Sequence, residues 1–303
     1  MKTRKSSVVY LSHIALAALL VLLFFVPKVR STVREPWSML LAILLMEGLF
    51  LLRYRKSRNR SVCDIMLFVW LLLILWEVWT SVLNAAHPVL VPCPENVFDT
   101  FREQSGEMLL NVLYSMELLF IGFGVGMLLA VGAGLAAGWF PRLRDFAYPI
   151  ANVMAPIPAV VFSPYLVALM PSFRSASVMV ILLGVFWPNF LSTINRVNGI
   201  APRIIDSARM LDLSHWTMIS QVLFPYVLKG IVSGLKVSVT TSLLMLNFAE
   251  LMGATHGMGY YVQNSITYAN YTHAVAGIIC IGIVVTLLNK GVSFIQKTFF
   301  IWR

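Results

Sequence analysis

Charged residues are scarce in this chain of 303 residues. Lys, Arg, Asp and Glu make up 12% of it, about half the share that a soluble domain carries, whereas 59% of the residues are hydrophobic. Several catalytic signatures are missing as well: there is no Gly-x-x-x-x-Gly-Lys-Ser/Thr phosphate loop, no His-Glu-x-x-His helix and no Ser/His/Asp set. We therefore expect neither an ATPase nor an intramembrane hydrolase, and we predict no catalytic residues and no bound cofactor.

Cysteine and acidic residues are also few. Cys63, Cys93 and Cys280 are scattered without metal-binding spacing, so neither a zinc site nor a disulfide framework is predicted. With 23 basic residues against 13 acidic ones, the formal net charge is +10. Such a charge can indicate nucleic-acid binding, but here the basic residues flank apolar runs, as the topology signals of membrane proteins do. No nucleic-acid partner is predicted.

Long apolar runs are what the chain has in abundance, and its mean hydropathy is +0.81. Each run approaches the roughly 20 residues that a helix needs to cross a hydrocarbon layer of about 30 Å. Lipid offers no partner for free backbone groups, so these runs must be helices, and the short alternating segments of a membrane barrel are absent. The predicted fold class is an all-α integral membrane protein with eight spans. They lie at roughly 8–27, 37–52, 62–85, 108–138, 146–170, 176–195, 226–251 and 271–296.

Basic residues are unevenly divided between the two sides of these spans. The first run lacks a small-residue cleavage site after Pro27, which favours an uncleaved span over a signal peptide. With the N-terminus in the cytoplasm, all but five of the basic residues fall inside. The five exceptions are Lys28, Arg30, Arg34, Arg102 and Arg174. The positive-inside rule therefore predicts that both termini are cytoplasmic.

The longest polar stretch predicted on the inside contains residues 201–225, which we call the 201–225 segment. Pro202 suits the first turn of a short helix, and Ser214 is a good N-cap for a second helix that ends before Pro225. The apolar positions share one face in each helix: Ile205, Ala208 and Leu211 in the first, Trp216, Ile219 and Leu223 in the second. Such a pair either docks on a partner or lies on lipid headgroups, and the periodicity favours neither.

The 201–225 segment resembles a known motif. Its run Asp206-Ser207-Ala208-Arg209-Met210-Leu211-Asp212-Leu213-Ser214, followed by Leu223-Phe224-Pro225, is similar to the EAA loop of ABC-importer permeases. In that family the loop reads Glu-Ala-Ala, three residues, then Gly. Asp212 stands in place of the Gly, and Asp is among the few residues that tolerate a positive φ.

Other pieces follow in the same order along the chain. They are Pro156-Ile157-Pro158, Gly230, Gly234-Leu235, Ala249-Glu250-Leu251-Met252-Gly253-Ala254 and Gly257-Met258-Gly259-Tyr260. As an ordered set they are similar to the nitrate, sulfonate, taurine and thiamine-precursor branch of these permeases, and the resemblance covers about residues 62–303.

The resemblance implies a six-helix core of the type I ABC importer fold, preceded by two extra N-terminal helices. Residues 1–60 would be the N-terminal extension and 61–303 the permease domain, with coupling helices at about 201–225. The implied protein is a non-catalytic subunit of the bacterial inner membrane that forms the pathway for a small solute of the sulfonate, taurine or nitrate kind. A thiamine-pyrimidine or flavin-type precursor is the alternative cargo.

The resemblance also implies partners. These are a second copy of the chain, two cytosolic ATPases that hold ATP and Mg²⁺, an extracytoplasmic solute-binding protein and the lipid bilayer. The residues implied to contact the ATPase are Asp206, Ser207, Ala208, Arg209, Leu211, Asp212, Ser214 and Trp216.

Five residues are candidates for the solute pathway. Pro156 and Pro158 break the fifth run near its middle, and a broken helix frees backbone groups that can line a cavity, a simple kink being the alternative. Asn189, Asn247 and Glu250 are polar residues in apolar runs. Glu250 serves either the solute or a structural hydrogen bond that caps the seventh span.

Small residues recur every four positions in the fourth run, at Gly122, Gly126, Ala130, Gly134 and Gly138. This period predicts close helix packing, and static packing is favoured over a sliding contact. A tightly packed bundle also argues against a loosely assembled membrane scaffold. A secondary transporter driven by an ion gradient would be expected to have inverted repeats, and none is visible.

Overall fold

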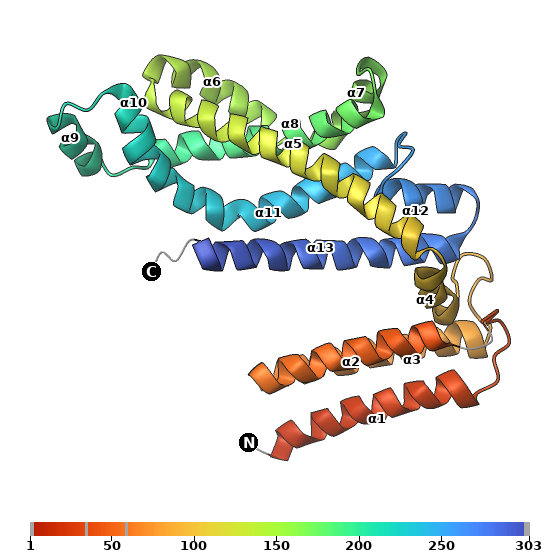
Figure 1. Ribbon diagram of the computed structural model, residues 1–303. Helices are drawn as coiled ribbons and strands as arrows, with labels where there is room; N and C mark the ends of the chain where they lie inside the picture. The colour runs from red at the N-terminus through yellow and green to blue at the C-terminus, as the bar shows by residue number, and fades with distance from the viewer. Residues whose placement is uncertain (1–2, 34–35, 58–59, 300–303) are drawn as a thin grey trace. The chain divides into compact units, whose positions relative to one another are not determined.

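The computed structural model describes residues 3–33, 36–57 and 60–299, and within these ranges the chain contains helices and no strands (Figure 1). Seven helices are long and apolar enough to cross a membrane, and a bent helix pair brings the number to eight. The predicted fold class is thereby confirmed.

The elements run in the following order. They are α1 (Thr3–Phe25), α2 (Trp37–Ser57), α3 (Arg60–Glu77) with a π turn at Val78–Val82, α4 (Pro94–Glu103), α5 (Ser105–Trp139), α6 (Pro141–Met154), a 3₁₀ turn (Ala159–Phe162) leading into α7 (Ser163–Leu169), α8 (Phe173–Asn198), α9 (Pro202–Met210), α10 (His215–Thr217), a π segment (Met218–Leu223), α11 (Phe224–Glu250), α12 (Met258–Thr267) and α13 (Tyr271–Phe299).

The chain forms two compact units. The first consists of Met1–Leu109 with Val262–Ile279, and the second of Leu110–Tyr261 with Cys280–Arg303. The third span therefore belongs to the same compact unit as the two N-terminal helices. The predicted domain boundary at residue 60 was drawn instead from the six-helix core of the resembled family. That boundary stays a prediction.

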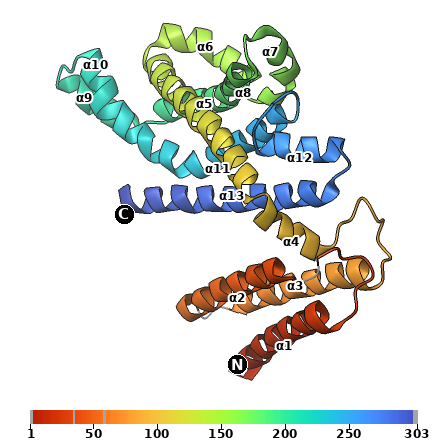
Figure 2. The ribbon, with the colours of Figure 1, turned by 45° about the vertical axis from the view of Figure 1, so that its right-hand side comes forward.

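In the first unit, α1, α2 and α3 lie side by side (Figures 1 and 2). Trp70 of α3 is fully buried between them, together with Leu19 of α1 and Met39 and Ile43 of α2. The three helices therefore bury an apolar stripe against one another.

A buried ionic network fastens the linker after α1. Lys28 Nζ lies 3.1 Å from Glu77 Oε1 at the end of α3 and also pairs with Glu95 of α4. Ser81 Oγ donates a hydrogen bond of 3.0 Å to Glu95 Oε2. Both carboxylates are almost fully buried, and Lys28 places one positive charge beside them, which offsets part of the cost of burying them.

In the second unit, α5 packs along α8 through the predicted small residues. A Cβ placed at Gly122 would come within 2.8 Å of Ile181 Cβ, and one at Gly134 within 2.6 Å of Thr193 Cβ. Real Cβ atoms do not approach this closely, so only glycine permits the observed separation of the two backbones. The prediction of close packing is confirmed.

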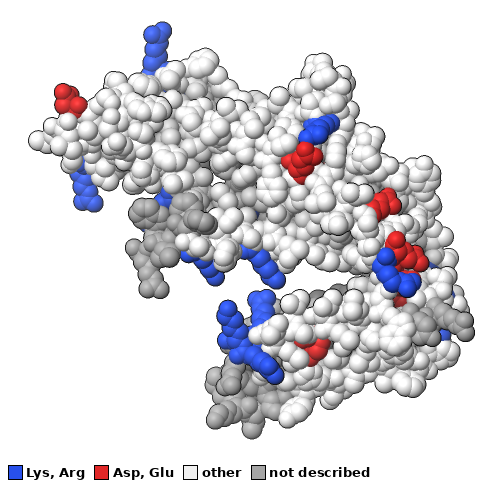
Figure 3. Space-filling view, viewed as in Figure 1, with Lys and Arg blue, Asp and Glu red and all other residues white. Residues whose placement is uncertain are grey.

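Outward-facing positions of the spans are apolar. Leu45, Leu75 and Leu128 are among the exposed large side chains, and most of the face drawn in Figure 3 is uncharged. A surface of this kind is suited to contact with lipid chains.

The fifth span is broken as predicted. Helix α6 ends at Met154, residues 155–158 are non-helical, and the following helical pair is inclined by 82° to α6. Pro156 and Pro158 cannot donate the backbone hydrogen bonds that would continue a helix through this point.

The seventh span differs from the prediction. A separate helix was expected to stop before Pro225, but the helical segment runs without interruption from His215 to Glu250, 36 residues in all. The reason is the π segment: Phe224 N–H bonds to Ile219 O, five residues back. In a regular α-helix the ring of Pro225 would clash with the carbonyl of Gln221, four residues earlier. The wider π turn just before Pro225 gives this ring room.

Candidate functional site

The 201–225 segment is held in a defined bend. Asp212 has a φ of +47°, a conformation that Asp adopts more readily than most residues. Ser214 caps the next turn, because its Oγ accepts a hydrogen bond of 3.2 Å from Thr217 N–H. Both local features agree with the sequence analysis.

One side of the segment packs inside the second unit. Ala208 and Leu223 are buried against Leu135 of α5 and Val197 of α8, with Ile205 and Ile219 partly buried beside them. In addition, Trp139 Nε1 donates a hydrogen bond of 3.0 Å to His215 Nδ1. The segment is therefore anchored on the long helices rather than hanging free.

The other side exposes large apolar residues. Met210, Leu211 and Trp216 are 89%, 72% and 76% exposed, and we call these three residues the apolar tip. The prediction of one shared apolar face in each helix was wrong at this point. Leu211 and Trp216 are exposed, whereas Ile205, Ala208, Ile219 and Leu223 are buried or partly buried.

The other predicted docking residues differ in exposure: Asp206, Ser207, Asp212 and Ser214 are exposed, whereas Ala208 is buried and its predicted contact with the ATPase was wrong. Ser207 Oγ donates to Arg203 O at 2.7 Å, within α9. Arg209 lies in α9, but its side chain lies outside what the structure describes.

A cavity of about 480 Å³ lies between the broken span, α8 and α11. We call it the central cavity. Pro156 and Pro158 line it on one side and Asn189 of α8 on another, so three of the five predicted pathway residues meet here. Ser238 Oγ of α11 lies 3.4 Å from Asn189 Oδ1, which joins the two helices across the cavity wall.

Two predicted pathway residues do not reach the central cavity. Glu250 is 1% exposed, and its carboxylate accepts hydrogen bonds from Ser115 Oγ at 2.6 Å and Gly259 N–H at 2.7 Å. The same Ser115 Oγ accepts from Met258 N–H at 2.8 Å. Glu250 thus joins α5 to the end of α11 and the start of α12, an arrangement that matches the structural alternative. Asn247 lies one turn before it and is also absent from the described cavity wall.

Arg196 is a charged residue of the cavity wall that was not among the predicted pathway residues. It follows Asn189 and Ser192 at helical spacing on α8, and all three line the central cavity. This helical spacing could have indicated that Arg196 shares a face with Asn189 and Ser192. The predicted sixth span ended at residue 195, however, so Arg196 was placed in the polar segment that follows it.

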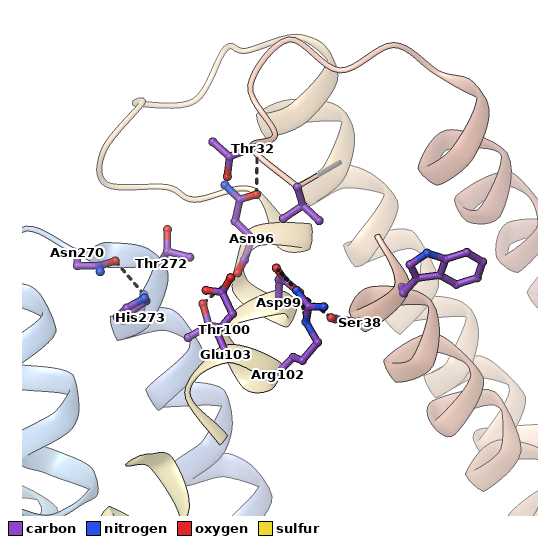
Figure 4. Close-up of a pocket in the computed structure, with 12 residues that line it drawn as sticks. Thr32, Ser38, Asn96, Asp99, Thr100, Arg102, Glu103, Asn270, Thr272 and His273 are labelled. Atoms are coloured by element: carbon purple, nitrogen blue, oxygen red, sulfur yellow. Dashed lines mark hydrogen bonds and ion pairs between the residues drawn. The ribbon is translucent and has the colours of Figure 1, made fainter. Parts of the chain in front are cut away.

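A second cavity, of about 530 Å³, lies within the first unit and was not predicted (Figure 4). Its polar groups largely bond to one another: Ser38 Oγ donates to Asp99 Oδ1 at 2.8 Å, Arg102 Nε lies 3.1 Å from the same oxygen, and Thr32 N–H donates to Asn96 Oδ1 at 3.3 Å. This pattern describes a junction between α2 and α4.

Comparison with known proteins places the chain among transport proteins. Residues 122–300 match the model of the family described as "binding-protein-dependent transport system inner membrane component". The chain is 26% identical to the putative aliphatic sulfonates transport permease protein SsuC of Bacillus subtilis over 231 residues, which are 76% of this chain and 83% of that protein. It is 25% identical to the taurine transport system permease protein TauC of Escherichia coli, with 83% and 94% covered.

Two further similarities agree with these. The nitrate import permease protein NrtB of Leptolyngbya laminosa is 25% identical, with 80% of this chain and 88% of that protein covered. Among solved structures, an inward-facing MetNI methionine ABC transporter matches with a TM-score of 0.56 and 16% identity, covering 64% of this chain and 97% of the matched chain.

Proposed function

Because the chain belongs to the family of binding-protein-dependent transport system inner membrane components and is thus a permease subunit of an ABC importer, we propose that it binds a cytosolic ATPase through the apolar tip of its 201–225 segment. Two copies of the chain would form the complete pathway, each with one ATPase. The ATPases would hold ATP and Mg²⁺, and an extracytoplasmic binding protein would deliver the solute.

The observation that carries this proposal is the contrast between the two sides of the 201–225 segment. One side is buried in the second unit, while Met210, Leu211 and Trp216 stand exposed at its end. Three exposed large apolar side chains at a bend on the predicted cytoplasmic side form a small patch of the kind that marks a protein interaction site. Tryptophan in particular is enriched among residues that dominate binding energies.

The continuous helix suggests how ATP hydrolysis would reach the pathway. Trp216 lies at one end of the 36-residue helical segment, and Ser238 and Thr241 of the same segment line the central cavity. A displacement of the tip by the ATPase would therefore move the cavity wall through one continuous helical segment. The π segment between them is the place where such a helix can change its local winding.

Orientation follows from the basic residues. The 201–225 segment and both termini are assigned to the cytoplasmic side of the bacterial inner membrane, because only this orientation places most Lys and Arg inside. The opposite end of the second unit, where Glu250 joins α5, α11 and α12, would then face the binding protein.

The relatives named for sulfonate, taurine and nitrate favour a small solute with an anionic group as the cargo. A thiamine-pyrimidine or flavin-type precursor is the alternative within the same branch.

Truncation of the tip tests the proposed ATPase contact. Trp216→Ala is expected to weaken binding of the ATPase roughly thirtyfold, the loss typical of a central aromatic residue in an interface. The measurement is co-purification of the ATPase and titration of its affinity in detergent. Trp37→Ala is the matched control, because Trp37 is also exposed, at 62%, but belongs to the first unit. Equal affinity for the Trp216→Ala variant and the unmodified protein would sink the assignment.

A further inference from the structure

Arg196 places a positive charge in the central cavity. It lies two residues before the last residue of α8, Asn198, is only partly exposed, and lines the cavity together with Gly230 of α11. A Cβ at Gly230 would overlap Nη1 of Arg196. Gly230 therefore provides the space that the guanidinium occupies, and the two residues lie against each other in the cavity wall.

The charge of Arg196 is not neutralised within the described part of the chain. No carboxylate of the described residues forms an ion pair with it, and none of the residues that line the cavity is acidic. Among the described residues, its side chain forms one hydrogen bond, from Nε to Ser192 Oγ at 3.3 Å. The other donors of the guanidinium are thus available to a bound molecule.

The surrounding groups add hydrogen-bonding capacity to this charge. Ser192 Oγ accepts from Arg196, so its own proton can be donated to a third group. Asn189 lies on the same face of α8, two turns from Arg196. A planar guanidinium next to a hydroxyl donor fits the oxygens of a sulfonate, carboxylate or nitrate, because it can bind two oxygens at once.

From this arrangement we propose that Arg196 and Ser192 bind the anionic group of the solute as it passes through the central cavity. This inference rests on the proposed function and adds to it a specific recognition residue and a ligand class, small oxyanions. Since Gly230 belongs to the same helical segment as Trp216, movement of the apolar tip would also change the space around the guanidinium. Binding of the anion and its release would then depend on the state of the ATPase.

The test is ATP-dependent uptake into liposomes that contain this chain with its ATPase and its binding protein. The probes are ethanesulfonate, taurine and nitrate, with choline as a cationic solute for comparison. Arg196→Gln is expected to lower the initial rate for the transported anion at least tenfold, and Gly230→Ala to lower it severalfold by displacing the guanidinium. Arg196→Lys, which keeps the charge but not the planar fork, is expected to fall between Arg196→Gln and the unmodified protein. Lys229→Gln is the matched control, because it removes a charge from the neighbouring position outside the cavity.

Several results would overturn the proposal: an unchanged rate for Arg196→Gln in a complex that co-purifies normally with its ATPase, equal losses for Arg196→Gln and Lys229→Gln, or uptake of choline alone. Repeating the assay in phosphatidylcholine with and without phosphatidylglycerol separates a solute from a lipid headgroup. A loss confined to phosphatidylglycerol would assign Arg196 to the headgroup and contradict the proposal. Absence of any ATP-dependent uptake by the unmodified complex would instead overturn the proposed function itself.

Discussion

At the scale of single residues, Glu250 illustrates how a buried carboxylate can serve the fold. It accepts hydrogen bonds from Ser115 and from the backbone of Gly259, and it lies at the junction of three helices. The sequence left a pathway role and a structural role open, because Ser115 is 135 residues away along the chain. No local pattern reveals such a partner.

Replacement of Glu250 is accordingly expected to affect stability more than solute specificity. Glu250→Ala leaves two buried donors without acceptors, at a cost of about 1–3 kcal/mol each. Glu250→Gln retains one acceptor oxygen and should be milder. Thermal unfolding of the purified protein in detergent measures the stability of both variants. A Glu250→Ala variant as stable as the unmodified protein would disprove the structural role.

Lys28 is the corresponding residue of the first unit. Lys28→Met leaves Glu77 and Glu95 buried without their cation, which is expected to destabilise the unit by about 3–5 kcal/mol. The control is Arg102→Met, because the pair of Arg102 with Asp99 is largely exposed on the arginine side, and such pairs contribute only about 0–1 kcal/mol. Chemical denaturation monitored by tryptophan fluorescence should separate the two variants clearly. Similar midpoints would contradict the account of the buried network.

At the scale of secondary-structure elements, the packing of α5 on α8 depends on which face a glycine occupies. Gly134→Leu would drive a side chain into Thr193 of α8, whereas a Cβ at Gly132 of the same helix would meet nothing within 4 Å. Gly134→Leu is therefore expected to destabilise the fold by about 1–3 kcal/mol or more through overpacking, and Gly132→Leu should be tolerated. The yield of monodisperse protein in size-exclusion chromatography compares the pair, and equal yields would contradict the proposed contact.

The helices themselves could largely be predicted from the sequence, because span length and the lipid environment leave few alternatives. The exceptions are the short helices α4 and α12, which lie between predicted spans, and the start of the seventh span. Pro225 normally signals a helix boundary, yet the π segment before it keeps His215 to Glu250 continuous. A change of helical winding over a few residues has no distinct sequence pattern. The exposure of Leu211 and Trp216 agrees with their predicted place among the ATPase contacts.

At the scale of the whole molecule, the permease function follows from family membership, whereas the proposed coupling to an ATPase is argued from one exposed patch. From the resemblance to the EAA loop the sequence predicted a docking role for the 201–225 segment, and this role stays a prediction. The sequence predicted Pro156, Pro158 and Asn189 as pathway residues but not Arg196, since three separate segments meet to form the central cavity. Their proximity is a property of the folded chain.

The most direct test of ATPase coupling is site-specific photocrosslinking within the assembled complex. Met210, which is 89% exposed at the apolar tip, and Met252, which is 51% exposed beyond the opposite end of α11, are each replaced by a photoreactive phenylalanine. The account predicts a crosslink from position 210 to the ATPase and none from position 252. A crosslink from position 252, or none from position 210 in a complex that hydrolyses ATP, would contradict it.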